Sequence, residues 1–595
     1  MIGFRCKSVN LRCAWVLFAG LLLSACSQPQ VKPKPPEPPE PTAVASPARP
    51  LPEEGGRQLA PEAEHEELTA SLLYGVLLGE IAGQRGRLDV AGASYLQAAK
   101  QSNDPRIAER ALKISIYGKQ PRLAYQAARR WVELAPDNAE ARQTLAVLAL
   151  RLDQRQEALN QFEYLLRQNN GRDSGASYQS MLALLAREPD KARALQVMEK
   201  LVEIRPQDPQ AYLAYARLAV RTEDWSLAEQ QIARSLELKP DWTEALILRA
   251  QVNLKQDRGS VAREQLESAL QRNPDNKGLQ LAYARLLVDL EDFDGARSQY
   301  RGLLKQQPDN GQIVYSLALL ALEAGDLKEA RTRFKRLVAL DFQTQQAYYY
   351  LGAIAEEQKK PELAMQWYGK VVAESDHWME VQIRIARLEA VAGEVKAARE
   401  RLRKLRLSQP GQAQRLFLVE GEILSAVERY EEAYKLYNEY LEIRPDDLEI
   451  LYARSLVAER LDRVDQAETD LQAILKLEPN NTRALNALGY TLADRTDRYE
   501  EALGYVQKAF DQTPKDPAVI DSLGWVLYRL GRLQEARDHL QNAYDMTGDG
   551  EIAAHLGEVM WAMGDKQRAR ALWDKARKEN PGDSVLEETV RRLSP

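Results

Sequence analysis

Residues 482–516 read TRALNALGYTLADRTDRYEEALGYVQKAFDQTPKD. With Thr482 counted as position 1, the large residue Leu488 stands at position 7 and the small residue Gly489 at position 8. After a one-residue insertion, Ala502 stands at position 20 and Pro514 at position 32. The apolar residues recur at helical spacing in two runs, and proline cannot continue the second run because it lacks an N–H group. The segment therefore predicts two short antiparallel helices joined by a turn.

The residue sizes in this segment have a physical reason. Small residues at positions 8 and 20 allow the two helices to approach closely, since a larger side chain would push their axes apart. Large apolar residues at positions 4, 7, 11 and 24 fill the space between one hairpin and the next. One hairpin cannot bury both apolar faces alone, so neighbouring hairpins are expected to stack.

The same template fits almost the whole chain, with repeats 1 to 15 starting at residues 72, 105, 139, 175, 209, 243, 277, 311, 345, 379, 414, 448, 482, 517 and 550. Position 20 is alanine in every repeat: Ala91, Ala124, Ala158, Ala194, Ala228, Ala262, Ala296, Ala330, Ala364, Ala398, Ala433, Ala467, Ala502, Ala536 and Ala569. Position 32 is proline in ten repeats. The pattern resembles the tetratricopeptide repeat (TPR), a helical hairpin of about 34 residues. The resemblance implies an all-α TPR superhelical solenoid of about fifteen helix-turn-helix repeats.

The solenoid is expected over residues 66–583, followed by a C-terminal capping helix over residues 584–595. The first two or three repeats fit the template loosely. Residues 169–175, NNGRDSG, have the composition of a flexible joint. Repeats 8 and 9 lack the terminal proline and end in Asp341-Phe342 and Asp376-His377-Trp378, where either a bend, an exposed contact or ordinary turn variation is expected.

The N-terminus has the pattern of a targeting segment. Three basic residues precede an apolar run over residues 14–23, which is too short for a mature transmembrane helix. The run ends in Leu23-Ser24-Ala25-Cys26, which resembles the lipobox of bacterial lipoproteins. This resemblance implies a signal peptide over residues 1–25 and lipidation of Cys26; an ordinary secretory signal is the alternative. Ser27 lacks the aspartate that favours retention in the inner membrane of such lipoproteins, which implies an outer-membrane anchor facing the periplasm.

Residues 26–65 differ in composition from the rest of the chain. Between residues 27 and 64, 11 of 38 residues are proline. Such a segment cannot bury a core and favours extended polyproline conformation. We interpret it as a disordered tether between the lipid and the solenoid.

No catalytic or metal-binding motif is recognisable. The chain lacks a glycine-rich phosphate loop, H-E-x-x-H and G-x-S-x-G, and its four histidines have no ligand companions at metal-binding spacing. The 81 basic and 87 acidic residues are interleaved, which is typical of a solvated surface and not of a nucleic-acid stripe. We therefore expect no enzyme activity, no cofactor, no metal and no nucleic-acid partner.

A protein-binding surface is the remaining candidate site. In TPR proteins the concave face is lined by the first helix of each repeat, mainly at positions 2, 5, 9 and 12. In the C-terminal half of the chain several of these positions are aromatic, and exposed aromatic residues favour partner binding. The alternative is that the next hairpin buries some of them. The candidate partner-binding residues are Tyr315, Tyr349, Tyr452, Tyr490, Trp525, Tyr528 and Trp561.

The lipobox, the tether and the repeats together resemble the outer-membrane TPR lipoproteins that act as adaptors for periplasmic carboxy-terminal processing proteases. The resemblance implies a scaffold that binds the protease and its substrates, peptidoglycan hydrolases that cut cross-links, and so promotes their proteolysis. Alternatives are a scaffold for exopolysaccharide export or outer-membrane assembly, and an activator of a peptidoglycan synthase.

Overall fold

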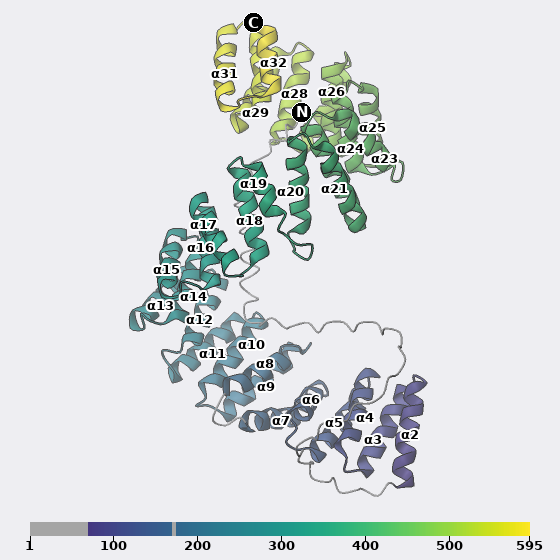
Figure 1. The fold of residues 1–595 in the computed structure, drawn as a ribbon, viewed down its shortest axis with the longest axis vertical. Coiled ribbons are helices and arrows are strands. Elements are labelled where there is room, and N and C mark those ends of the chain that lie inside the picture. The colour runs from purple at the N-terminus through teal and green to yellow at the C-terminus, as the bar shows by residue number, and fades with distance from the viewer. Residues whose placement is uncertain (1–68, 169–173, 595) are drawn as a thin grey trace, which may run out of the picture. The chain divides into compact units, whose positions relative to one another are not determined.

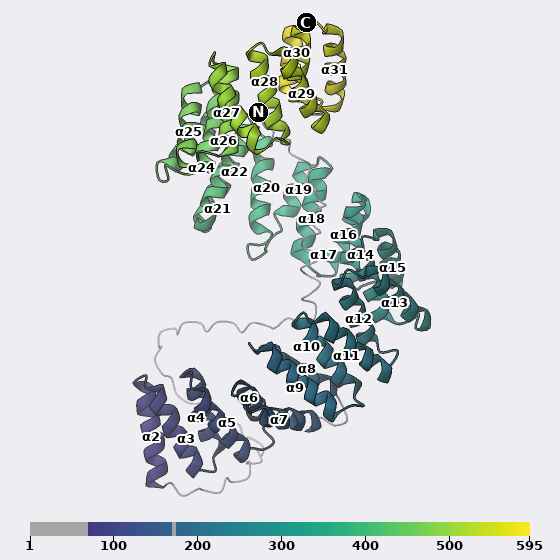
Figure 2. The same cartoon turned by 180° about the vertical axis from the view of Figure 1, so that it is seen from behind.

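The computed structural model describes residues 69–168 and 174–594. Within these ranges the secondary structure consists of α-helices and one 3-10 helix, without strands. The described chain divides into two compact units, with the boundary in sequence between Pro308 and Asp309. Within each unit, consecutive helices form antiparallel hairpins that follow one another in chain order (Figures 1 and 2). The prediction of an all-α TPR solenoid is confirmed.

In the N-terminal unit the first helices of the hairpins carry even labels: α2 (Ala70–Gln84), α4 (Pro105–Tyr117), α6 (Ala139–Arg151), α8 (Ser174–Leu185), α10 (Pro209–Arg221), α12 (Thr243–Lys255) and α14 (Lys277–Asp289). Their partners are α3 (Leu88–Gln101), α5 (Pro121–Leu134), α7 (Arg155–Gln168), α9 (Lys191–Ile204), α11 (Trp225–Leu238), α13 (Gly259–Arg272) and α15 (Phe293–Gln306).

In the C-terminal unit the first helices are α16 (Gly311–Glu323), α18 (Thr344–Glu357), α20 (Trp378–Val391), α22 (Ala413–Ala426), α24 (Leu448–Arg460), α26 (Thr482–Arg495), α28 (Pro517–Arg529) and α30 (Gly550–Ala562). Their partners are α17 (Leu327–Ala339), α19 (Pro361–Tyr368), α21 (Val395–Ser408), α23 (Tyr430–Leu441), α25 (Val464–Leu477), α27 (Tyr499–Gln512), α29 (Leu533–Thr547) and α31 (Lys566–Glu579). A 3-10 helix (Pro410–Gln412) precedes α22, and α32 (Ser584–Leu593) ends the chain.

The contacts within each hairpin follow the expected register. All fifteen alanines at position 20 are buried, with exposed fractions of 0 or 1 %. Where position 8 is glycine, the missing Cβ makes room for a large side chain at position 24 of the same hairpin. An added Cβ at Gly421 would overlap the ring of Tyr437, and one at Gly557 would overlap the indole of Trp573. In these hairpins, the glycine at position 8 therefore allows a large side chain at position 24 to pack between the two helices.

Side-chain caps fix the starts of several first helices. Asn481 precedes α26 and its Oδ1 accepts a hydrogen bond from the backbone N–H of Ala484 at 3.1 Å. Asp447 caps α24 and Asp516 caps α28 in the same way. At these three boundaries a proline stops one helix, and an acidic or amide residue shortly after it caps the start of the next.

Repeat 9 departs from the regular hairpin. Its second helix, α19, has 8 residues, whereas the second helices of the other repeats have 12 to 15. Residues 369–377 form turns and bends instead of completing the helix. By contrast, the second helix of repeat 8, α17, has its ordinary length of 13 residues. The loss of the terminal proline therefore marks a change in helix length in repeat 9 but not in repeat 8. Of the joint expected at residues 169–175, residues 169–173 lie outside the described residues, and Ser174 and Gly175 begin α8.

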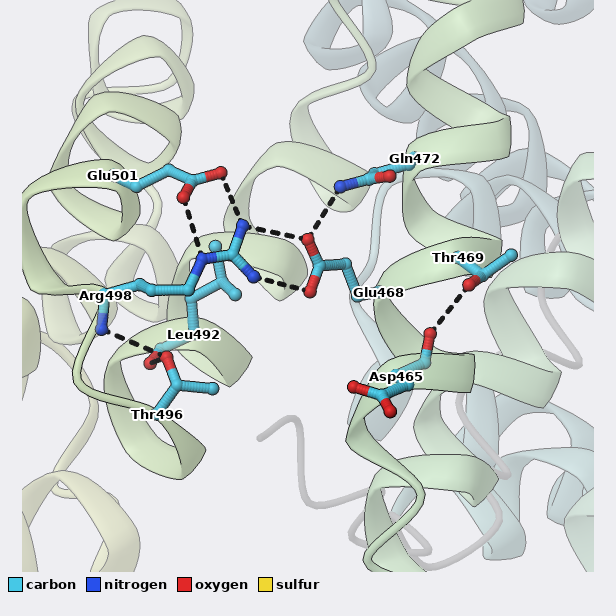
Figure 3. A network of polar contacts seen from close by, with 8 residues as sticks. All are labelled: Asp465, Glu468, Thr469, Gln472, Leu492, Thr496, Arg498 and Glu501. Carbon is cyan, nitrogen blue, oxygen red and sulfur yellow. Dashed lines mark hydrogen bonds and ion pairs between the residues drawn. The ribbon is translucent and has the colours of Figure 1, made fainter.

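Ion pairs link the second helices of neighbouring repeats. Arg498, at the start of α27, donates to both carboxylate oxygens of Glu468 in α25 at 2.7 and 3.0 Å (Figure 3). The same guanidinium donates to Glu501 one turn later at 2.8 Å. Arg258 makes a similar contact with Glu229 at 2.8 Å in the N-terminal unit. We call these contacts the inter-repeat clamps.

Candidate partner-binding surface

The candidate residues lie on the first helices of their repeats, on the side that we call the helix-A surface and define by positions 2, 5, 9 and 12. Tyr315, Tyr490 and Trp525 are buried, with exposed fractions of 7, 4 and 6 %. The other four candidates are half-buried: Tyr349, Tyr452, Tyr528 and Trp561. These three residues follow the alternative in which neighbouring hairpins bury some of the candidates, because aromatic side chains of the same and later repeats pack against their rings.

Two of the buried candidates form one cluster with a histidine. The ring of His555, in α30, stacks on Trp525, in α28, with centroids 4.2 Å apart and an interplanar angle of 26°. The ring of Tyr490, in α26, lies 6.1 Å from that of His555. Tyr528 extends the cluster, with its ring 5.2 Å from that of Trp525. Three consecutive repeats thus contribute to one aromatic cluster, which we call the C-terminal aromatic cluster.

His555 is held by an acidic partner. Its Nδ1 lies 3.0 Å from Oδ1 of Asp521, and both side chains are buried. Burial by itself would lower the pKa of His555, but the charge of Asp521 and its hydrogen bond outweigh burial and raise this pKa. The pair therefore favours the protonated imidazole between Trp525 and Asp521.

Carboxylates from four successive repeats surround the same cluster. Trp525 Nε1 donates to Asp494 Oδ1 at 3.2 Å. Glu459 in α24 and Glu551 in α30 are also buried. Burial raises the pKa of Tyr490 well above its usual value, and the negative charges of Asp494, Glu551, Asp521 and Glu459 raise it further. Burial likewise raises the pKa of Glu551 to about 7.

An ion pair between Arg592 and Glu558 lies beside the C-terminal aromatic cluster. Arg592 of α32 donates to both oxygens of Glu558 in α30, at 2.5 and 3.1 Å. The hydroxyl of Tyr528 donates to the same carboxylate at 3.3 Å. The last helix therefore covers the final hairpin partly through a charged contact, in addition to the buried Leu586.

The remaining candidates lie apart from this cluster. Tyr315 contacts Phe334 edge-on at 6.4 Å. Tyr349 stacks on His377 at 4.5 Å, and the guanidinium of Arg483 lies 4.2 Å from the ring centroid of Tyr452. Trp561 stacks on Trp573 of its own hairpin at 5.7 Å. The structure thus brings together three of the seven predicted residues, Tyr490, Trp525 and Tyr528.

Sequence reasoning missed the polar half of the site: Glu459, Asp494, Asp521, Glu551, His555 and Glu558. A signal for it was present. Four of these acidic residues occupy positions 12, 5, 2 and 9 of their repeats, the same positions that contained the aromatic candidates. The acidic and aromatic residues at these positions together indicate an acidic, aromatic face on the first helices.

Metal sites and membrane-spanning helices can be examined in the described part of the chain. Residues 69–168 and 174–594 contain no group of three or more histidine, cysteine or acidic side chains arranged to hold a metal ion. None of the helices in these ranges has both the length and the apolar composition needed to cross a bilayer. The cluster combines aromatic rings with carboxylates, which suits recognition of a polypeptide.

Models of the tetratricopeptide repeat match the chain over residues 96–310 and again over residues 281–341, 315–377, 452–517 and 522–584. A TPR repeat-containing protein of Pseudomonas aeruginosa is 39 % identical over 525 residues, which is 88 % of each chain. The bacteriophage adsorption protein A of Escherichia coli is 33 % identical over 93 residues, 16 % of this chain and 9 % of that protein.

Among solved structures, the Cut9 and Hcn1 hetero-tetramer of the APC/C contains a chain with 16 % identity and a TM-score of 0.31, which covers 88 % of this chain and 97 % of that one. A TPR protein of Thermus thermophilus is 26 % identical with a TM-score of 0.28, covering 30 % of this chain and 98 % of its own. From the repeat matches and the full-length relative, this chain belongs to the tetratricopeptide-repeat proteins.

Proposed function

We propose that this chain is a non-catalytic scaffold that binds a periplasmic carboxy-terminal processing protease together with its substrates, peptidoglycan hydrolases. TPR repeats imply a protein–protein interaction scaffold, and the fold is typically non-catalytic. The observation that carries the proposal is the C-terminal aromatic cluster with its carboxylates, because aromatic residues beside charged groups are typical anchors of protein interfaces. The protease and the hydrolases are proposed from the resemblance to protease adaptors.

The scaffold would act by raising the effective concentration of its partners. Holding enzyme and substrate on one chain converts their encounter into a local event, which can raise the rate without a new catalytic group. A lipid on Cys26 and the proline-rich residues 27–64 would restrict the scaffold to the periplasmic face of the outer membrane.

Capture from membranes tests the partners. The full-length chain, purified in detergent and immobilised, is incubated with a detergent extract of cell envelopes, and the retained proteins are identified by mass spectrometry. We expect a carboxy-terminal processing protease and peptidoglycan hydrolases. Retention of polysaccharide-export proteins, outer-membrane assembly proteins or a peptidoglycan synthase in their place would support an alternative and overturn the proposal.

Reconstitution tests the activity. Purified protease and hydrolase are mixed with and without the chain, and the loss of intact hydrolase is followed over time. Faster proteolysis with the chain supports the adaptor function, whereas an unchanged rate contradicts it.

Anchoring is tested separately, by membrane fractionation and labelled fatty acid. Cys26→Ala should abolish fatty-acid incorporation and release the chain from the membrane fraction. Label that still enters the Cys26→Ala chain would contradict the assignment of the lipidation site.

A further inference from the structure

Four first helices each contribute a carboxylate to the surroundings of Tyr490. Glu459 comes from α24, Asp494 from α26, Asp521 from α28 and Glu551 from α30. All four interact electrostatically with the Tyr490 hydroxyl. Four successive repeats therefore concentrate negative charge beside the rings of Tyr490 and Trp525. Such an arrangement is costly unless a cation compensates it.

Two cations of the described chain lie among these carboxylates. Arg495 is shared among three carboxylates: it lies 3.0 Å from Asp494, 3.4 Å from Asp462 and 3.8 Å from Glu459. His555 serves Asp521. A single guanidinium thus forms ion pairs with Asp494, with Glu459 and with Asp462, whose side chain is 83 % exposed.

Glu459 combines deep burial with a long ion pair. Its exposed fraction is 4 %, yet its Oε1 accepts no hydrogen bond from residues 69–168 or 174–594, and its ion pair with Arg495 is long at 3.8 Å. Burial raises the pKa of its carboxyl. Buried polar atoms are nearly always hydrogen-bonded, so an unsatisfied carboxylate oxygen on this surface indicates a missing donor.

We propose that this surface, formed by Glu459, Asp494, Asp521 and Glu551 around Tyr490 and Trp525, binds a lysine- or arginine-bearing segment of a partner polypeptide. The inference rests on the proposed scaffold function and specifies the chemistry of the segment that the scaffold recognises. The cation hydrogen-bonds to Glu459 and lies against the aromatic rings, which attract cations through their π-electrons. The carboxylates also disfavour acidic segments, which makes the surface selective by charge.

A peptide titration of the full-length chain in detergent tests the proposal. The probes are two short fluorescent peptides, one of alternating lysine and serine and one of alternating glutamate and serine, and binding is followed by fluorescence anisotropy. We expect the lysine peptide to bind and the glutamate peptide not to bind. Binding of the lysine peptide should weaken as salt is added, because part of the attraction is electrostatic.

The decisive variant is Glu459→Gln, which keeps the shape of the side chain and removes its charge. We expect it to lower the affinity for the lysine peptide by about tenfold or more, because a buried charge pair loses one partner. The matched control is Glu449→Gln on the same helix, where the carboxylate is 54 % exposed and pairs with Arg483. The control should bind as the unmodified chain does. Melting temperatures of both variants establish that they are folded.

Two results would overturn the inference: equal affinity of the Glu459→Gln and Glu449→Gln chains for the lysine peptide, or equal binding of the lysine and glutamate peptides. The capture experiment separates this failure from failure of the scaffold function. If the unmodified and the Glu459→Gln chains retain the same partner protein equally, the cationic site is wrong and the scaffold stands. If the unmodified chain retains no partner protein, the scaffold function itself is wrong.

Discussion

The helix-A surfaces of the two units differ although their hairpins share one register. In the N-terminal unit, position 9 is basic in three repeats, as Lys113, Arg217 and Arg285. In the last three repeats it is Tyr490, Trp525 and Glu558. Position 20, inside the hairpins, is alanine in both units. The hairpin contact is therefore constant along the chain while the surface of the first helix varies, so the two units offer different chemistry to partners.

The largest expected effect concerns the buried aromatic rings. Tyr490→Ala and Trp525→Ala should each lower the free energy of unfolding of the C-terminal unit by about 3–5 kcal/mol, because each leaves a cavity among buried neighbours. Arg217→Ala, at the same position in the N-terminal unit, should cost less than about 0.5 kcal/mol. Urea unfolding followed by circular dichroism gives both values. Equal costs would show that position 9 has the same environment in both units.

A smaller effect is expected at the shared hairpin contact. Ala398→Leu inserts bulk into a site with an exposed fraction of 1 %, and overpacking of this kind costs about 1–3 kcal/mol. Ala228→Leu in the N-terminal unit should cost a similar amount, since its site is also closed. Ala397→Leu is the matched control because it is the exposed neighbour of Ala398 in α21. If Ala397→Leu and Ala398→Leu unfold alike, the assignment of position 20 to the hairpin contact fails.

Stability of the C-terminal unit should also depend on pH. The folded state raises the pKa of His555, through Asp521, and that of Glu551 to about 7, through burial. Both groups bind protons more tightly in the folded than in the unfolded state. Their stabilising contribution is therefore present at low pH and lost as the pH rises through the folded pKa values. The melting temperature should be a few degrees lower at pH 8 than at pH 6.

Substitutions can show which residues cause this pH dependence of stability. Asp521→Asn removes the charge that raises the pKa of His555, so the remaining burial should lower that pKa and reduce the fall in stability with pH. His539→Gln is the control, because burial already lowers the pKa of His539 and its contribution has the opposite sign. A fall that is unchanged in Asp521→Asn would exclude the His555–Asp521 pair as its source.

The smallest effect is expected at the inter-repeat clamps. Arg498→Ala removes the contacts with Glu468 and Glu501 on the surface (Figure 3) and should cost about 0.2–1 kcal/mol, decreasing with added salt. Arg258→Ala, which breaks the contact with Glu229, should cost about as much in the N-terminal unit. A fall of more than about 2 kcal/mol in the free energy of unfolding at either position would contradict the small contribution expected of exposed ion pairs.

The sequence alone determined the elements of this fold. Each helical hairpin is specified by proline at position 32, by the capping residue that follows it, and by the small residues at positions 8 and 20. These residues act locally, so they can be recognised in the sequence of a single repeat. All fifteen alanines at position 20 accordingly lie buried where the register places them. The missing proline alone does not determine helix length, since repeats 8 and 9 both lack it but α17 has 13 residues and α19 has 8.

Only the tertiary structure decided which helix-A side chains are buried and which residues meet there. Tyr490, Trp525 and His555 belong to three different repeats, and Glu459, Asp494, Asp521 and Glu551 to four. Their meeting depends on the rotation and displacement from each hairpin to the next, which the periodicity of a single repeat does not specify. For that reason the sequence identified these aromatic residues as first-helix positions and left their burial as one of two alternatives, and it did not identify the carboxylates that surround them.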